Sequence, residues 1–350
     1  MKTAIIMASV ASMISLPALA EEESYPKLSG ELSIEVQNDW TYQSDDPAAE
    51  INDLYPTLTL GNRLEFNENF SLNSEATFEP VKDPTGDRAF EDLGGYLNIL
   101  TANFAKDNYE VYAGKFTPNF GLAWDVAPGL YGTDLNEDYE FAEMIGVGGS
   151  VGFHAAGEHT ISASTFFQDT TFLSNSVGTQ RGVLHRSDGG PANTESLSSY
   201  AVALDGGFDG VAGFNYHAGF SSLAEGEDGN KHQLGYVVSA EYAFQVNDQV
   251  TITPFAEYAY FDNAGGIDGD SAKYLTVATS VNYMNWVAST TYQRRDTETG
   301  GVDTDDHVWD LTLGYDFDCG LGVAAAWRLA EEGGVDSKGL GMLVSYAIEF

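Results

Sequence analysis

Apolar and polar residues alternate along most of this chain with a period of two. Over residues 28–42 the even positions are mainly apolar, as at Leu32, Ile34 and Val36, and the odd positions are polar. Alternation sustained for about fifteen residues indicates a β-strand longer than the ~5–6 residues typical of globular proteins. The same alternation recurs in segments 54–66, 70–78, 234–244, 250–260, 275–283, 286–292, 309–317, 321–329 and 340–350. Weaker alternation marks segments 96–104, 109–116, 145–153, 160–167, 199–208 and 211–220, so the pattern predicts sixteen strands.

The connections between these segments fall into two classes. Tight turns are expected at 67–69, 106–108, 157–158, 247–249 and 318–320. Long, acidic and Gly-rich loops are expected at 43–52, 81–92, 261–272, 294–306 and 330–337. Short turns at one end and long loops at the other are typical of a β-barrel in an outer membrane. An even number of strands places both termini at the end with the short turns.

A soluble β-sandwich is the competing fold, because its strands also alternate. Sandwich strands rarely exceed ~10 residues, and their polar face meets bulk water. The apolar rows of this chain begin and end in Tyr, Phe or Trp, while their middles hold Leu, Val, Ile and Ala. Aromatic ends around an aliphatic middle are typical of strands that cross lipid headgroup layers. The pattern therefore favours an all-β fold, a 16-stranded antiparallel transmembrane β-barrel.

The first twenty residues have the features of a targeting segment. Lys2 is followed by a mainly apolar stretch at 5–16, and residues 17–20 end in an Ala-x-Ala pattern. These features predict a cleaved secretory signal peptide over residues 1–20, which leaves 21–350 as the barrel. No later stretch approaches ~18 consecutive apolar residues, so the pattern predicts no transmembrane helix after Ala20. The expected location is the outer membrane.

Composition and motifs exclude several other classes of function. The chain has 53 acidic and 15 basic residues, a formal charge of −38, which argues against nucleic-acid binding. A single Cys excludes a disulfide framework. The six His residues form no H-x-x-x-H pattern and no G-x-S-x-G motif is present, so neither an enzyme nor a cofactor is expected. The acidic stretches 262–270 and 303–306 suit Ca²⁺ or Mg²⁺, but a solvated acidic surface is favoured over a metal site.

A barrel of about sixteen strands encloses an aqueous channel rather than a packed core. The connection at 117–140 contains Pro118 and Pro128, which break strand pairing, together with several large apolar residues. We expect it to fold inward as the third loop and to present its carboxylates to the lumen. The alternative is an outer loop buried at a subunit contact.

Polar residues in phase with the lumen mark the expected pore lining. The residues predicted to line the pore or its constriction are Glu35, Arg63, Glu65, Lys115, Asp125, Asp134, Glu137, Asp138, Glu140 and Arg328. Further inward acids are expected at Glu31, Glu75, Glu79, Glu257 and Asp310. The alternation does not assign a direction to Lys115, which lies at a strand end.

The whole chain resembles the Gram-negative porins. The resemblance covers the leader, the sixteen strands, the long third loop and the C-terminal row of Tyr346, Ile348 and Phe350. It implies a homotrimer of passive channels for ions and small hydrophilic solutes, with a constriction set by the third loop. The aromatic C-terminus resembles the signal read by the barrel-assembly machinery that inserts such proteins into outer-membrane lipid.

The motif at 113–121 and the charges of the inward residues predict opposite ion selectivities. Residues 113–121, AGKFTPNFG, resemble the phosphate-selective porins, which implies a preference for anions. Inward acids, however, outnumber inward bases, and the third loop has five carboxylates and no Lys or Arg. Rings of Asp and Glu favour cations, so the residues predict a modest cation preference. A plugged barrel with a structural or adhesive role is a further alternative.

Overall fold

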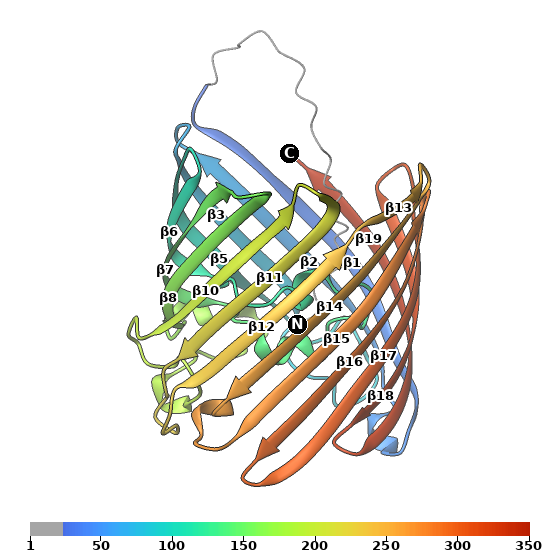
Figure 1. Cartoon of the computed structure of the whole chain (residues 1–350). Helices are drawn as coiled ribbons and strands as arrows, with labels where there is room; N and C mark the ends of the chain where they lie inside the picture. The colour runs from blue at the N-terminus through green and yellow to red at the C-terminus, as the bar shows by residue number, and fades with distance from the viewer. Residues whose placement is uncertain (1–23) are drawn as a thin grey trace.

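The computed structural model describes residues 24–350, which form a closed antiparallel β-barrel (Figure 1). The predicted signal peptide at 1–20 lies outside the described residues. The wall consists of β1 (Lys27–Ser44), β2 (Asn52–Glu65), β3 (Phe70–Pro80), β5 (Leu93–Lys106), β6 (Tyr109–Phe116), β7 (Met144–His154), β8 (Glu158–Gln168), β10 (Ser199–Phe208), β11 (Val211–Leu223), β12 (Gln233–Tyr242), β14 (Val250–Asp262), β15 (Ser271–Tyr283), β16 (Trp286–Thr299), β17 (Val302–Asp316), β18 (Leu321–Glu332) and β19 (Val335–Glu349). β1 pairs with both β2 and β19, which closes the barrel. The predicted sixteen-stranded antiparallel barrel is confirmed.

Three very short strands add to this wall without changing its topology. β13 (Phe244–Asn247) continues the line of β12 along β14, and β4 (Arg88–Ala89) pairs with β2. β9 (Val177–Gly178) pairs with β5. The helices are short, namely α1 (Ala123–Val126) and 3-10 turns at Pro47–Ala49, Asn136–Tyr139, Phe172–Ser174, Arg186–Asp188 and Ala264–Gly266. No helix within residues 24–350 has the length and apolarity needed to cross a membrane.

The two faces of the wall differ in the way the alternation predicts. Outward residues such as Val238, Leu311 and Val344 are exposed, although they are apolar. Many inward residues between them are polar, and several, including Glu257 and Gln293, are buried inside the barrel. An apolar surface of this extent around a closed barrel is the surface that lipid covers in outer-membrane proteins.

Short turns join the strands at one end of the barrel, at the top of Figure 1, and longer connections lie at the other end. The prediction of long loops at 294–306 and 330–337 is wrong. β16 and β17 continue to a two-residue turn at Gly300-Gly301, and β18 and β19 continue to Gly333-Gly334. All four glycines have positive φ angles of 59° to 79°, which the tight hairpin turn requires. The alternation disappears there because both faces of these extensions are polar.

The chain leaves the wall after β6 and returns to it at β7, and residues 117–143 between them form the inner loop. Its apolar side chains pack on the inward face of the barrel: Phe120 and Phe141 pack beside Phe261 and Phe166, and Leu135 packs beside Val308. Figure 1 shows this segment, with helix α1, inside the barrel. The apolar residues of the segment thus lie inside the barrel, as their composition predicts.

The connection between β8 and β10 pairs with the part of β5 that β6 does not reach. β6 ends at Phe116, which leaves residues 93–99 of β5 without a neighbour on that side. β9 pairs there with Gly94 and Gly95. Through β9 this connection extends the wall beside β5, so it is not a free outer loop.

Candidate functional site

The inner loop is fastened to the wall by buried polar residues of β14 and β16. Glu257, which is 2% exposed, accepts hydrogen bonds from the backbone N–H groups of Leu122 (2.7 Å) and Ala123 (3.2 Å) and from the Tyr139 hydroxyl (2.7 Å). The Gln293 amide donates to the Tyr131 carbonyl (2.7 Å) and accepts from the Leu135 N–H (2.8 Å). These groups satisfy backbone donors and acceptors that a buried loop would otherwise leave unpaired.

Asp310 has the same role on β17, where it approaches the N–H of Tyr131 at 3.4 Å and accepts from the Thr312 hydroxyl at 2.9 Å. The alternation predicts Glu257 and Asp310 as inward acids, and both do point into the barrel. The inner loop covers them, however, so neither faces the open lumen.

The five predicted carboxylates of the inner loop divide into two groups. Asp134 forms an ion pair with Arg328 (2.7 Å), and Asp138 forms one with Arg295 (2.6 Å). Asp125 is exposed to the lumen, and Glu137 and Glu140 are partly exposed. Among residues 24–350, no Lys or Arg forms an ion pair with Asp125 or Glu140.

The enclosure of Asp125 and Glu140 by the barrel changes their acidity. Burial inside the barrel, followed by repulsion from Glu257 and Glu75, raises the pKa of Asp125 to about 6. Burial, with repulsion from Asp125 among others, raises the pKa of Glu140 to about 8. The inner loop therefore carries two carboxylates whose charge changes across the neutral range of pH.

The wall of β1 to β3 is also acidic on its inward face. Glu35 on β1 and Glu75 and Glu79 on β3 alternate there with the outward apolar residues. Glu79 accepts hydrogen bonds from the hydroxyls of Tyr96 and Thr57. None of these three glutamates has an ion pair with a Lys or Arg in the described part of the chain.

The inward arginines, by contrast, are all neutralised. Arg88 contacts Asp53 through Nε (2.8 Å) and Nη2 (2.6 Å), and Arg328 contacts Glu332 as well as Asp134. The remaining inward pairs are Arg63 with Glu65, Arg181 with Glu143, and Arg295 with Asp138 and Asp306. An arginine held by a carboxylate on both arms offers little attraction to a passing anion.

A cavity of about 580 Å³ lies beside this wall, toward the long loops. Its lining includes Asp39, Tyr55 and Glu79, together with the paired Arg88 and Arg181. Asp39 accepts hydrogen bonds from the hydroxyls of Tyr55 and Tyr131, both at 2.9 Å, and so connects the wall to the inner loop. The space is large enough for hydrated ions and small polar solutes.

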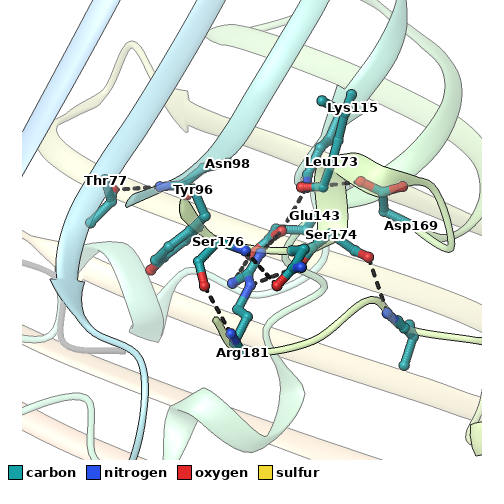
Figure 2. Close-up of polar contacts among 12 residues, drawn as sticks. Thr77, Tyr96, Asn98, Lys115, Glu143, Asp169, Leu173, Ser174, Ser176 and Arg181 are labelled. Atoms are coloured by element: carbon teal, nitrogen blue, oxygen red, sulfur yellow. Dashed lines mark hydrogen bonds and ion pairs between the residues drawn. The ribbon is translucent and has the colours of Figure 1, made fainter. Parts of the chain in front are cut away.

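Lys115 does not line the water-filled space, which corrects the prediction for this residue. Its side chain is 1% exposed, and its Nζ contacts Glu143 (2.6 Å), Asp169 (2.9 Å) and the Leu173 carbonyl (3.0 Å). Figure 2 shows Arg181 approaching the same Glu143 from below, with Tyr96 beside it. Two carboxylates and a carbonyl compensate for the burial of the ammonium group.

Arg63 and Glu65 lie away from the constriction. They are near the short-turn end of β2. Thr57, the β2 residue opposite Glu35, lies six or more residues away, which corresponds to about 20 Å along the strand. They contribute to the mouth of the barrel rather than to its narrowest part.

Sequence reasoning missed the residues that close the cluster around Glu143. Arg181 donates to both carboxylate oxygens of Glu143 (2.8 and 2.5 Å), and its guanidinium lies 4.0 Å from the centroid of the Tyr96 ring. Arg181 belongs to a long connection without hydrophobic periodicity, so no sequence pattern could have placed it. The positive φ of Glu143 (59°) is likewise visible only in the structure.

Comparisons with known proteins agree with this architecture. No protein-family model matches the chain, and no curated protein sequence is significantly similar to it. OccK1 (OpdK) of Pseudomonas aeruginosa is similar in structure, with a TM-score of 0.60, 10% identity, and coverage of 92% of this chain and 99% of that one. Salmonella typhi OmpF in complex with daunomycin has a TM-score of 0.59 and 15% identity, with coverage of 92% of this chain and 98% of that one. The outer-membrane channel DcaP of Acinetobacter baumannii has a TM-score of 0.55 and 12% identity, with coverage of 94% and 100%. At such low identities, the likeness shows that the chain shares the barrel fold of these outer-membrane proteins.

Proposed function

We propose that this protein is an outer-membrane porin, a water-filled channel for passive diffusion of ions and small hydrophilic solutes with a modest preference for cations. One observation carries the preference: the inward arginines are paired with carboxylates, whereas Glu35, Glu79, Asp125 and Glu140 form no ion pair with a Lys or Arg among the described residues. The phosphate-selective alternative lacks such support, since Lys115, the only base in the motif at 113–121, is buried.

The electrostatics follow from this pairing. A paired arginine and carboxylate form a dipole whose field falls off quickly, while an unpaired carboxylate acts at longer range. The low-dielectric wall concentrates that field in the lumen, and exposed charges of the outer loops are screened beyond ~8 Å at physiological salt. Ionised carboxylates on both the inner loop and the opposite wall therefore favour the entry of cations, and Asp125 and Glu140 ionise as the pH rises through their pKa values of about 6 and about 8.

The proposal also covers export and assembly. Residues 1–20 would be removed as a signal peptide. The row of Tyr346, Ile348 and Phe350, on β19 and at the C-terminus, would be read by the barrel-assembly machinery during insertion into outer-membrane lipid. The mature chain would form a homotrimer, as the resemblance to porins implies, and would act without a cofactor and without catalysis.

The decisive experiment is single-channel recording in a planar bilayer with a gradient of KCl across it. We expect discrete conductance steps and a reversal potential that shows potassium to be more permeant than chloride. A reversal potential of the opposite sign would contradict the cation preference, and the absence of any steps from folded protein would contradict the channel. Cross-linking of the purified protein in detergent separately tests the trimer.

A further inference from the structure

His217 connects the wall of the barrel to the beginning of the inner loop. It lies on β11 and is 1% exposed. Its Nδ1 is 2.6 Å from Oδ1 of Asp205 on β10, and its Nε2 is 2.5 Å from the backbone oxygen of Phe120 in the inner loop. Both ring nitrogens therefore face oxygen acceptors. Only a protonated imidazole has a hydrogen on each nitrogen, so the imidazolium is the form that can donate to both oxygens at once.

The surroundings of His217 act on its charge in two directions: burial disfavours a positive charge, and the neighbouring acids and hydrogen-bond acceptors favour it. The charged groups that face it are Asp205 from β10 and Glu257 from β14. On β12 the residue paired with His217 is Ser239, which is neutral. The inner loop presents Asn119 and the Phe120 carbonyl, which are neutral as well. No second base of the described chain contacts this group.

The same carboxylate also holds the inner loop directly. Asn119 donates to Oδ2 of Asp205 (2.9 Å) and to the Ser162 hydroxyl on β8 (3.1 Å). Asp205 thus binds the histidine through one oxygen and the loop through the other. The first residues of the inner loop are docked on the wall through Asp205 and His217 together.

We infer that His217 is a positioning residue for the constriction, and that its proton determines whether residues 119–121 stay docked on the wall. This inference rests on the proposed function, because it requires the inner loop to narrow a conducting channel. When the ring loses a proton, the remaining hydrogen stays on Nδ1, where the carboxylate is the stronger acceptor. The Phe120 carbonyl then faces a nitrogen lone pair and loses its only donor from the ring.

The expected consequence is a change in conduction on the alkaline side. Docking is stabilised while the ring is protonated, and this stabilisation is lost as the pH rises through the pKa of the docked histidine. The docked loop already lies against the wall, so its release can move it only toward the axis of the barrel. Release should therefore lower the mean conductance and increase open-channel noise.

The test is single-channel recording of the full mature protein between about pH 5 and pH 10, a range that brackets the ordinary imidazole pKa of ~6.5. Wild type should pass to a noisier state of lower conductance as the pH rises. In His217→Asn this step should vanish, because the amide does not titrate. In Asp205→Asn the step should move to lower pH by about 1–3 units, since the neighbouring opposite charge is lost. His307→Asn, at a partly exposed residue of β17, is the matched control and should leave the step in place.

Several outcomes would overturn the inference. Wild-type conductance and noise that do not change with pH would overturn it. A step that persists unchanged in His217→Asn or in Asp205→Asn would also overturn it. Heat-modifiable migration on gels establishes that each variant is folded, and Asp205→Asn remains informative if His217→Asn does not fold. The KCl reversal potential, recorded at neutral pH in the same membranes, separates the two proposals. Cation preference without an alkaline step rejects only the role of His217, and a barrel that conducts nothing rejects both.

Discussion

Two walls of this barrel have the same alternating pattern and different surroundings. The wall formed by β14 to β18 holds Glu257, Gln293 and Asp310 on its inward face, all of them covered by the inner loop. The wall formed by β1 to β3 holds Glu35, Glu75 and Glu79 on its inward face, where no described residue of that loop forms a hydrogen bond with them. An inward glutamate is thus an anchor for the loop in one wall and a source of field in the other.

The comparison shows that the partner, and not the residue type, decides what an inward acid does. Glu257 meets three donors from the inner loop, so its charge is used locally. Glu35 is also buried, at 6% exposure, but no hydrogen bond or ion pair links it to another described residue, so no local partner uses its charge. Four predictions test this distinction, beginning with the largest expected effect.

Replacing residues 125–138 by a short Gly-Ser linker removes the middle of the inner loop and uncovers the first wall. The single-channel conductance should rise on the order of twofold or more, because the cross-section available to ions increases. Larger uncharged sugars should also pass in liposome-swelling assays. An unchanged conductance from a folded variant would place the loop outside the permeation path.

Glu257→Gln tests the anchor in the covered wall. The amide presents N–H groups or a single oxygen to three donors, so at least one donor from Leu122, Ala123 or Tyr139 stays unpaired. The docking of the loop should weaken by about 1–3 kcal/mol. Faster cleavage within the inner loop by a protease added to the detergent-solubilised barrel measures this effect. Equal cleavage rates for this variant and wild type would show that Glu257 is not an anchor.

Glu35→Gln is the matched change in the wall of β1 to β3. The stability of the inner loop should be unaffected, and the ratio of potassium to chloride permeability should fall by a factor of about two, or ~0.4 kcal/mol. Reversal potentials in a KCl gradient supply the ratio. The distinction between the walls fails if Glu35→Gln loosens the loop while Glu257→Gln changes only the selectivity.

The smallest effect concerns pH. The pKa values of Asp125 and Glu140 are raised to about 6 and about 8, so each carboxyl is neutral below its value and ionised above it. Cation preference should therefore increase in the neutral range as the pH rises from about 5 to about 9. Glu140→Gln should remove the upper part of this increase, with Glu298→Gln at the exposed end of β16 as the control. A preference that declines over this range would contradict the assignment.

The strands were predictable because alternation is a local property of the chain. Segments such as 109–116 and 199–208 coincide with β6 and β10 as the structure has them. The hairpin extensions around Gly300-Gly301 and Gly333-Gly334 were missed, because strand residues beyond the membrane have no apolar face to reveal them. Their signal was the Gly-Gly pair itself, which two-residue turns favour.

The candidate site was predictable only in outline. Periodicity correctly places Glu257 and Glu35 inside the barrel. The local sequence around both is the same kind of pattern, with polar residues on the inward face, so it does not show which of the two the inner loop contacts. Lys115 shows the same limit, since its ion pairs with Glu143 and Asp169 depend on segments 28 and 54 residues further along the chain.

The sequence by itself determined that the chain forms a sixteen-stranded barrel with an apolar exterior, because the period of two assigns each residue to one side of a strand. It also determined that an apolar segment, 117–140, must leave the water. Only the tertiary structure decided which charges remain unpaired, that is, that Arg88, Arg181 and Arg328 are neutralised while Glu35, Glu79 and Asp125 are not. The physical reason is that pairing acts over a few ångströms between strands and loops far apart in the chain, and a local pattern has no record of such contacts.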